Sequence, residues 1–486
     1  MGQPSVKKNY FFRLFYEILT LAAIFVTTPY VSRVLGADGV GVDSYVSSIV
    51  GYFTMFAALG TASYGAREIA RHRDEPETAS KLFWEIEILT VFTSLICLVL
   101  WLVVIVFSSE YRPYFLALTP MLFATMADVS WYFTGYEQIK YTVIGNSICK
   151  LLGIVLIFAL VKEKTDILTY CVINSCMQLV GNLMMWLFLP RTLVKVKLHN
   201  LEIGRHFRET LTYFVPSVAI SVYTVLDKTL IGVLTGSKHQ NGYYEQANRV
   251  INVIKLLAVL SLNTVMGARM AYLFAEKKHE EIRERLKYSM DFILLAGIGS
   301  AFGISGIAQV LVPLFFGAGY EPVVGLLCLM SPLIVIIGIS NCLGNQYYTP
   351  NGRIKQITKY IVLGATVNLA VNLILIPNFG AYGATVSSII AEMVITLLYI
   401  RNSDGYITLG LLWRQMWKKL TAGTLMVIIV MAVGRQLDMS PLVVLVLQII
   451  IGVCVYAMVL LLLKDSMIKN LFQTGLDIIK KRGEKG

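Results

Sequence analysis

The sequence is poor in charge, in histidine and in paired cysteines. Only 15% of its 486 residues are Asp, Glu, Lys or Arg, whereas about 25% is usual in soluble domains. This scarcity excludes a soluble enzyme and a disordered chain, since both need more polar sequence. A disulfide-rich secreted domain is excluded as well, because the seven cysteines show no paired spacing.

Residue types that build catalytic or metal sites are also scarce inside the apolar stretches. All seven cysteines fall within these stretches, where we interpret them as small core residues. All five histidines fall between them, so neither a zinc site nor a Ser-His-Asp triad can be assembled at membrane depth. We therefore expect no enzyme activity, no metal site and no cofactor.

Long hydrophobic runs are what the sequence has in abundance. Hydrophobic residues make up 56% of the chain, and a run of about 20 apolar residues can cross the ~30 Å hydrocarbon core of a bilayer. No cleavable signal peptide is evident at the start. We predict an all-α integral membrane protein with about fourteen transmembrane helices, over residues 11–32, 42–66, 82–107, 113–135, 142–161, 167–189, 210–235, 243–268, 289–315, 323–345, 360–377, 381–400, 420–436 and 440–463.

The net charge of +12 could indicate a nucleic-acid partner, but its distribution indicates membrane orientation instead. Of the 42 Lys and Arg residues, 31 fall in one set of alternate loops together with both termini, six in the opposite loops and five within the spans. Cytoplasmic loops carry such an excess of basic residues. We therefore predict cytoplasmic termini, a multi-pass location in a bacterial plasma membrane, and no nucleic-acid partner.

Two parts of the chain repeat each other in order. Residues 34–67 resemble 233–269, with Tyr45 and Tyr244 at matching positions, and residues 143–148 resemble 362–367. An even number of spans per copy gives a parallel pseudo-two-fold repeat, which lets a transporter alternate access around a central site. We predict an N-terminal six-helix lobe (1–189), a basic cytoplasmic linker (190–209), a C-terminal six-helix lobe (210–400), a cytoplasmic loop with two extra helices (401–463), and a cytoplasmic amphipathic tail (464–486).

A few charged residues fall inside the predicted spans. A charge at the bilayer centre costs about 2.5–3.5 kcal/mol on insertion scales, so it should face the bundle interior or a wet cavity. We interpret the charges near span ends as structural pairs or end residues: Arg13, Glu85, Glu87 and Asp291. The deeper charges predict a wet cavity: Asp128, Lys150, Lys228, Arg249 and Glu392. The cations among them suit an anionic group such as a pyrophosphate.

Several motifs resemble those of a known family. Residues 29–36 (PYVSRVLG), 41–45 (GVDSY) and 64–70 (YGAREIA) resemble the opening of oligosaccharide flippases, and residues 243–252 resemble the eighth span of that family. The chain thus resembles the Wzx-type polysaccharide repeat-unit transporters of the MOP superfamily, relatives of the lipid II flippase and the MATE exporters. The resemblance covers essentially the whole chain. One departure is Ala268, where the family pattern has proline before Arg-Met.

The resemblance implies two six-helix lobes around a cationic cavity and no covalent chemistry. It implies translocation of undecaprenyl-diphosphate-linked oligosaccharide units from the cytoplasmic to the outer leaflet by alternating access, for capsule or other surface polysaccharide synthesis. By the same analogy, the two extra helices offer a groove to the polyprenyl tail. The implied partners are this lipid-linked substrate, membrane lipids, and a polysaccharide polymerase with glycosyltransferases. Arg33 and Asp43 match family motif positions and become gate or cavity candidates.

On this hypothesis cations bind the pyrophosphate, while polar and aromatic side chains contact sugar. Coupling to H+ or Na+ could run through Asp128, Asp227 or Glu392, and membrane potential could also drive transport. The substrate-binding candidates are Arg13, Arg33, Asp43, Asp128, Lys150, Tyr223, Asp227, Lys228, Arg249, Asn252 and Glu392.

Three rival functions remain open at this point, and the third of them, a purely structural scaffold, would not need so many charges at membrane depth. A MATE-like multidrug or cation antiporter would have a more apolar and acidic cavity and typically twelve spans. A membrane-bound polymerase or acyltransferase would usually need a large outward loop or His and Asp sites at membrane depth. The sequence has neither feature, and the buried cations and fourteen predicted spans favour the flippase.

Overall fold

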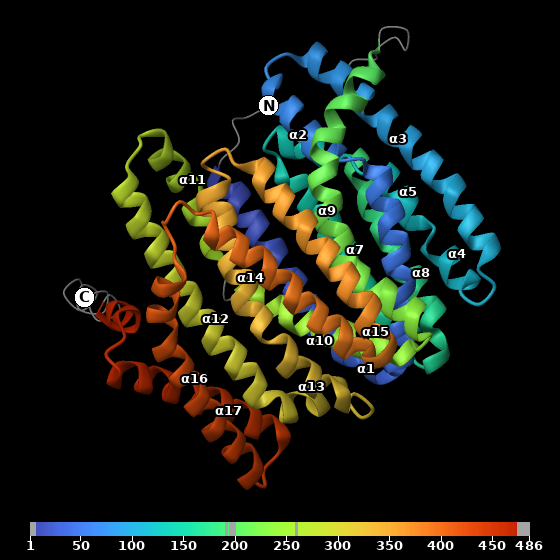
Figure 1. The fold of residues 1–486 in the computed structure, drawn as a ribbon. Coiled ribbons are helices and arrows are strands. Elements are labelled where there is room, and N and C mark those ends of the chain that lie inside the picture. Colours follow the sequence, from blue (N-terminus) through green and yellow to red (C-terminus); the bar gives the residue numbers. More distant parts are fainter. Residues whose placement is uncertain (1–5, 190–192, 194–200, 258–260, 474–486) are drawn as a thin grey trace, which may run out of the picture. The chain divides into compact units, whose positions relative to one another are not determined.

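The computed structural model describes residues 6–189, 193, 201–257 and 261–473, and every regular element in these ranges is a helix (Figure 1). Nine of the described helices are long and apolar enough to cross a membrane. The prediction of an all-α, multi-pass membrane protein is therefore confirmed. The count of fourteen spans stays a prediction, since two of the nine helices each cover two predicted spans.

The helices of the first half follow from long apolar stretches with few interruptions. α1 (Val6–Ala58) contains the predicted span 11–32 and most of 42–66, whose last residues lie in α2. It breaks at Gly36, whose φ of 69° lies in the left-handed region that glycine adopts at little cost. The other long helices here are α3 (Pro76–Phe107), α7 (Ile139–Leu160), α8 (Ile167–Trp186) and α9 (Ile203–Thr235), and the shorter α2 (Thr61–Arg71) follows α1.

The prediction of one continuous helix over residues 113–135 is wrong. This stretch forms α4 (Arg112–Leu118), α5 (Pro120–Met126) and α6 (Ser130–Gly135). Pro120 has no N–H with which to continue α4, so it begins a new helix instead. The Asp128 carboxylate accepts a 2.9 Å hydrogen bond from the backbone N–H of Ser130 and fixes the turn before α6. Asp128 therefore lies in a turn and not within a helix.

The second half contains the remaining helices. They are α10 (Lys238–Lys255), α11 (Ser261–Ala275), α12 (His279–Phe316), α13 (Glu321–Met330), α14 (Pro332–Leu343), α15 (Ile354–Arg401), α16 (Leu409–Gln436) and α17 (Pro441–Leu462). Pro332 interrupts the predicted span 323–345, which is therefore two helices and not one. α15 covers two predicted spans and breaks at Gly380, where φ is 54°.

Contacts within the chain divide it into two compact units, Met1–Gly242 and Tyr243–Gly486. We refer to them as the first and second units. α9 belongs to the first unit, although the repeat pattern places its sequence with the later spans. The division into six-helix lobes, the linker and the two-fold repeat stay predictions.

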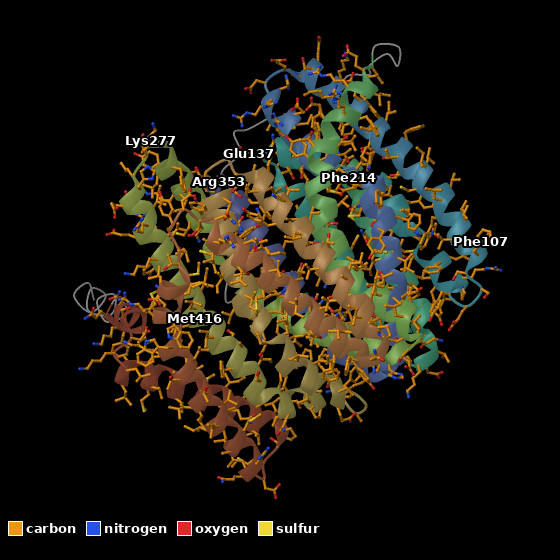
Figure 2. The ribbon with its side chains drawn as sticks, viewed as in Figure 1. Phe107, Glu137, Phe214, Lys277, Arg353 and Met416 are labelled. Carbon is orange, nitrogen blue, oxygen red and sulfur yellow. The ribbon has the colours of Figure 1, made fainter. Side chains whose placement is uncertain are left out.

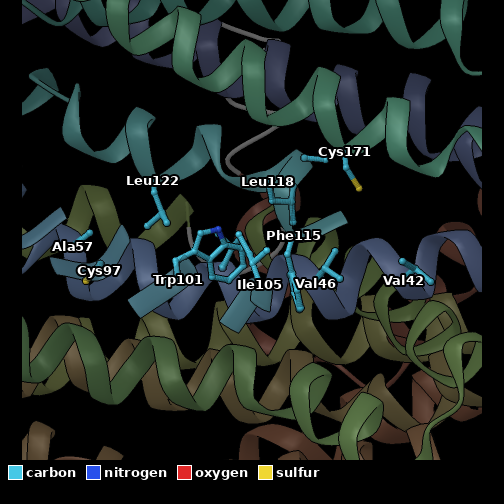
Figure 3. Packing of buried hydrophobic residues seen from close by; sticks show 12 residues of the cluster. Val42, Val46, Ala57, Cys97, Trp101, Ile105, Phe115, Leu118, Leu122 and Cys171 are labelled. Atoms are coloured by element: carbon cyan, nitrogen blue, oxygen red, sulfur yellow. The ribbon is translucent and has the colours of Figure 1, made fainter. Parts of the chain in front are cut away.

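Aromatic packing holds the first unit together on one side (Figure 3). Trp101 of α3 lies 5.1 Å from Phe115 of α4 and 5.1 Å from Phe53 of α1, measured between ring centroids. Its indole N–H donates to the Thr119 hydroxyl at 3.2 Å. A buried indole needs such a partner, because an unpaired buried donor costs about 1–3 kcal/mol. This contact ties the broken α4–α5 segment to two long helices.

Candidate functional site

A polar strip runs along the first half of α1 and includes one predicted cation from α7. The Lys150 ammonium donates to the Thr20 hydroxyl at 2.8 Å and lies 5.0 Å from the centre of the Tyr16 ring. One turn earlier, the Arg13 guanidinium pairs with Glu17 at 3.2 Å, with both side chains exposed. The structure thus brings two predicted site residues, Arg13 and Lys150, to the same stretch of α1.

Lys150 differs from most buried cations in the kind of partner it has. Among the described residues, no carboxylate lies within 4.0 Å of its ammonium group, and the side chain is half-buried. A hydroxyl and an aromatic face stabilise an ammonium without neutralising it. Within the described residues, the partners of the Lys150 ammonium are therefore uncharged, and an anion could bind it.

A second polar contact joins α1 to the middle of α9. The Ser48 and Thr229 hydroxyls are 2.8 Å apart, and Thr229 also donates to the Tyr52 hydroxyl at 3.2 Å. A Cβ on Gly232 would lie 2.2 Å from a ring carbon of Tyr45, so only glycine allows the two helices to approach this closely. Sequence reasoning missed Ser48, Tyr52 and Thr229, because isolated hydroxyls are common in membrane helices and give no distinctive signal.

Asp227 and Lys228 lie beside this contact but point in different directions. Successive helical residues are about 100° apart around the axis. Asp227 is only 2% exposed, whereas Lys228 is half-buried. The Lys228 carbonyl accepts a 2.8 Å hydrogen bond from the Asn241 side chain. Tyr223 lies on the same helix among residues whose side chains are outside the described part of the structure.

The two candidates from the family motif lie on either side of the break in α1. Arg33 is exposed, three residues before Gly36. Asp43 is half-buried and accepts from the Ser47 hydroxyl at 3.4 Å and from the Cys171 thiol at 3.6 Å. These contacts hold Asp43 within the first unit, and neither residue contacts Lys150.

Glu85 and Glu87, both interpreted from sequence as structural, differ in their partners. Glu85 accepts from His206 at 2.7 Å and from the backbone N–H of Glu202 at 2.7 Å, and the other His206 ring nitrogen lies 2.6 Å from the Tyr64 hydroxyl. The structural interpretation of Glu85 is thus confirmed. Glu87 is equally buried, but neither of its carboxylate oxygens has a hydrogen-bond partner among the described residues.

The second unit contains the other predicted site residues. Arg249 donates to Glu245 at 2.7 Å across one turn of α10, and the Arg249 side chain stays 27% exposed. Asn252 is exposed on the next turn. Glu392 of α15 is 8% exposed and interacts electrostatically with Lys255 of α10, a cation to which sequence reasoning gave no role.

A buried charge cluster near the end of the second unit was also missed. Lys419 of α16 is fully buried, and its ammonium donates to Asp291 at 2.7 Å and to Asp465 at 3.0 Å. The prediction that Asp291 is structural is confirmed. Lys419, the cation that pairs with Asp291, was not predicted as a buried residue, because α16 begins at Leu409 and not at the predicted residue 420. Lys419 is therefore a helix-interior residue and not a loop residue.

Comparison with known proteins decides the family. Residues 6–266, more than half of the chain, match the family described as polysaccharide biosynthesis protein. The chain belongs to this family. A protein of Escherichia coli K12 assigned as an O-antigen transporter is 24% identical over 393 residues, which cover 78% of this chain and 92% of the relative. The low-salt glycan biosynthesis flippase Agl15 of Haloferax volcanii is 22% identical over 264 residues, covering 53% of this chain and 55% of the relative.

Solved structures with the same fold come from the MOP superfamily. The lipid II flippase MurJ in an inward closed conformation has a TM-score of 0.71 at 16% identity, covering 95% of this chain and 99% of that chain. An inward-facing MATE family multidrug resistance transporter has a TM-score of 0.60 at 15% identity, covering 84% of this chain and 94% of that chain. The family match and the sequence relatives confirm the predicted resemblance to polysaccharide transporters, and these structures show the fold. The sequence relatives are assigned as transporters and a flippase.

Proposed function

We propose that this protein is a flippase for lipid-linked polysaccharide units. Its substrate is an oligosaccharide on undecaprenyl diphosphate, which it moves from the cytoplasmic to the outer leaflet of a bacterial plasma membrane. Family membership supports the class of function, and so do relatives assigned as glycan transporters. The charge distribution of the loops supports cytoplasmic termini. A polymerase and glycosyltransferases are the expected partners.

The single observation that carries the proposal is Lys150. It is a half-buried cation in a helix that can cross the membrane, and its described partners are a hydroxyl and an aromatic ring. A diphosphate would complete the ion pair that the protein itself leaves incomplete. Arg13 lies on the same stretch of α1 and supplies a second cation whose guanidinium is exposed. Lys228 of α9 is an additional diphosphate ligand in this proposal, and Arg249 stays a separate candidate within the second unit.

An apolar pocket in the second unit suits the polyprenyl tail. It measures about 210 Å³ and lies between α12, α16 and α17, the last two being the extra helices. Gly299, Gly303 and Gly452 are part of its wall. A Cβ on Gly299 would lie 2.9 Å from the Tyr456 ring, so glycine here allows α12 and α17 to pack closely. Most of the lining is aliphatic, as an isoprenoid chain requires. The sugar-diphosphate head would then move through the protein while the tail stays in the bilayer.

Alternating access requires helices to separate at one end of the cavity. A close glycine crossing between α1 and α10 is a candidate for the place where they separate. A Cβ on Gly41 of α1 would lie 1.7 Å from the Lys238 carbonyl oxygen, and one on Gly242 would lie 2.0 Å from the Ala37 carbonyl oxygen. In our proposal this crossing opens outward during each cycle. An H+ or Na+ gradient acting on Asp227 or Glu392, or the membrane potential, supplies the driving force.

The proposal is tested by replacing Lys150 with Gln and measuring delivery of labelled lipid-linked repeat units to the outer leaflet of proteoliposomes. A charge-assisted hydrogen bond contributes about 1.5–3 kcal/mol, so delivery should fall roughly tenfold or more. Lys162→Gln, which changes an exposed lysine just after α7, is the matched control and should be active. Normal delivery by Lys150→Gln at equal expression would contradict the proposal, as would transport of cationic dyes in place of the glycolipid.

A further inference from the structure

Glu87 is a buried carboxylate that the proposed transport cycle does not use. It is 3% exposed, and both carboxylate oxygens are without hydrogen-bond partners among the described residues. An ionised carboxylate that is buried and unpaired costs several kcal/mol. Such a carboxyl group is therefore either protonated or paired with a cation from outside the described residues.

Glu87 is one of the residues that line a pocket of about 530 Å³ between α3, α5 and α8. We call this the Glu87 pocket. Apart from the acid, its lining is apolar and aromatic: Trp84, Ile88, Val91, Phe123, Met126, Ala127, Leu179, Leu183 and Trp186. The Trp186 indole N–H already donates to the Ala127 carbonyl at 2.9 Å, so it does not compete for a ligand. Such a pocket fits an organic group with one polar, positively charged end.

The position of the pocket along α3 places it at the depth of lipid head groups. With 32 residues, α3 is about 48 Å long, longer than the ~30 Å hydrocarbon core. Its lipid-exposed apolar residues begin at Phe92 and run to Phe107, which lies at the outer edge of the molecule in Figure 2. Glu87 lies just before this run. Tryptophans such as Trp84 and Trp186 are enriched at the membrane interface.

The pocket opens toward the bilayer. Phe123 and Leu183 line it and are 41% and 49% exposed, so acyl chains can reach its mouth. Asp128, in the turn after α5, interacts electrostatically with Glu87 and adds a second negative charge nearby. Two carboxylates and two indole rings favour a cationic group over an anionic one in the position beside Glu87. The ligand is therefore cationic at one end and apolar at the other.

We propose that the Glu87 pocket binds the ammonium head group of a membrane aminophospholipid. The Glu87 carboxylate accepts hydrogen bonds from the ammonium, and Trp84 and Trp186 provide apolar and aromatic contact. The acyl chains extend past Leu183 along the exposed face of α3. This lipid stays in place and is separate from the substrate, so the proposal stands or falls independently of the flippase function.

The test measures which lipids stay bound to the purified full-length protein by native mass spectrometry. Phosphatidylethanolamine and phosphatidylglycerol with identical acyl chains are offered in mixed micelles. Wild type should retain the ethanolamine lipid about tenfold better, and Glu87→Gln should lose this preference. Glu77→Gln is the matched control, because Glu77 is an exposed acid in the first turn of the same helix. An unchanged preference in Glu87→Gln would overturn the proposal.

Two further measurements test whether the pocket recognises both the head group and the acyl chains of the lipid. Leu183→Trp obstructs the lipid-exposed mouth without touching the acid, so it should also reduce retention; full retention would overturn the proposal even if Glu87→Gln folds poorly. Glycerophosphoethanolamine, which has the head group but no acyl chains, should fail to displace the lipid. The proposal would be overturned if this soluble compound displaced the lipid equally well. It would also be overturned if the infrared signal of a protonated Glu87 were the same with and without the lipid.

Discussion

Glu85 and Glu87 lie two residues apart on α3 and are equally buried, yet their surroundings differ completely. Each is 3% exposed. Glu85 accepts hydrogen bonds from His206 and from a backbone N–H, whereas the Glu87 carboxylate oxygens have no partner among the described residues. Burial alone therefore does not separate a charge that the protein pairs from one without a described partner; the contacts do.

The same contrast distinguishes the cations of the two units. In the second unit, Lys419 is fully buried and bonded to two carboxylates, which leaves the cluster with no spare positive charge. In the first unit, Lys150 is half-buried and bonded to the Thr20 hydroxyl. Charges that the protein neutralises stabilise its own fold, and charges that it leaves incomplete are available to a ligand. Substitutions at both kinds of site test this distinction.

The largest effect on stability is expected for Lys419→Met. Removing the cation leaves the buried Asp291 and Asp465 carboxylates facing each other, and breaking a buried pair costs about 3–5 kcal/mol. Thermal unfolding in detergent should therefore begin at a clearly lower temperature. Lys418→Met is the control, because this neighbouring lysine contacts an exposed backbone carbonyl and the Trp417 ring and no carboxylate among the described residues.

The same cluster offers a sharper form of this test. Replacing Lys419, Asp291 and Asp465 together by Met, Asn and Asn removes all three charges, so most of the lost stability should return. If the triple variant is as unstable as Lys419→Met, the loss comes from packing and not from unpaired charge.

A smaller loss is expected for Glu85→Gln. The amide keeps the size of the side chain but removes the charge that His206 and the Glu202 backbone contact at 2.7 Å. Hydrogen bonds to charged groups contribute about 1.5–3 kcal/mol, so unfolding stability should fall by about 2 kcal/mol. Glu87→Gln, without added aminophospholipid, should be neutral or slightly stabilising. A loss of stability at Glu87 equal to that at Glu85 would erase the contrast between them.

Most of the fold could be predicted from the sequence, because each span is a long apolar run and membrane backbone must form helices. The spans broken at Pro120 and Pro332 were harder to predict, since each proline occurs in a run that is otherwise continuously apolar. The partners of buried charges could not be predicted. Glu85 and His206 are 121 residues apart, and Lys419 and Asp291 are 128 apart. Local sequence around Glu85 and Glu87 contains nothing that distinguishes them.

Only part of the candidate site could be predicted, because the partners of its charges are also distant in sequence. Insertion cost identified Lys150 as a deep charge, but only the packing of α7 on α1 shows that its partner is Thr20 and not an acid. For Asp43, the motif resemblance gave the position, and the contact with Cys171 of α8 emerged only from the fold. Sequence identifies which charges need a partner, and three-dimensional contacts show whether the protein supplies one.

The smallest effect on unfolding stability is expected when an exposed ion pair is removed, even if its two charges are as close together as those of the buried pairs. The Lys238 ammonium lies 2.8 Å from Glu110, with the two side chains 43% and 61% exposed. Solvent screening limits such a pair to about 0–1 kcal/mol. Glu110→Gln should therefore change unfolding stability by far less than Lys419→Met, although the ion-pair distances are nearly equal.

This exposed pair also makes a pH prediction. The hydrogen bond to Glu110 raises the pKa of Lys238 above its usual value. A raised folded-state pKa means that the small stabilisation is present below the unfolded pKa and disappears as the pH rises through the folded one. Wild type and Glu110→Gln should thus differ slightly at neutral pH and converge in strongly alkaline buffer. A difference as large as that for Lys419→Met would show that distance, and not burial with its partners, determines the contribution of a charge.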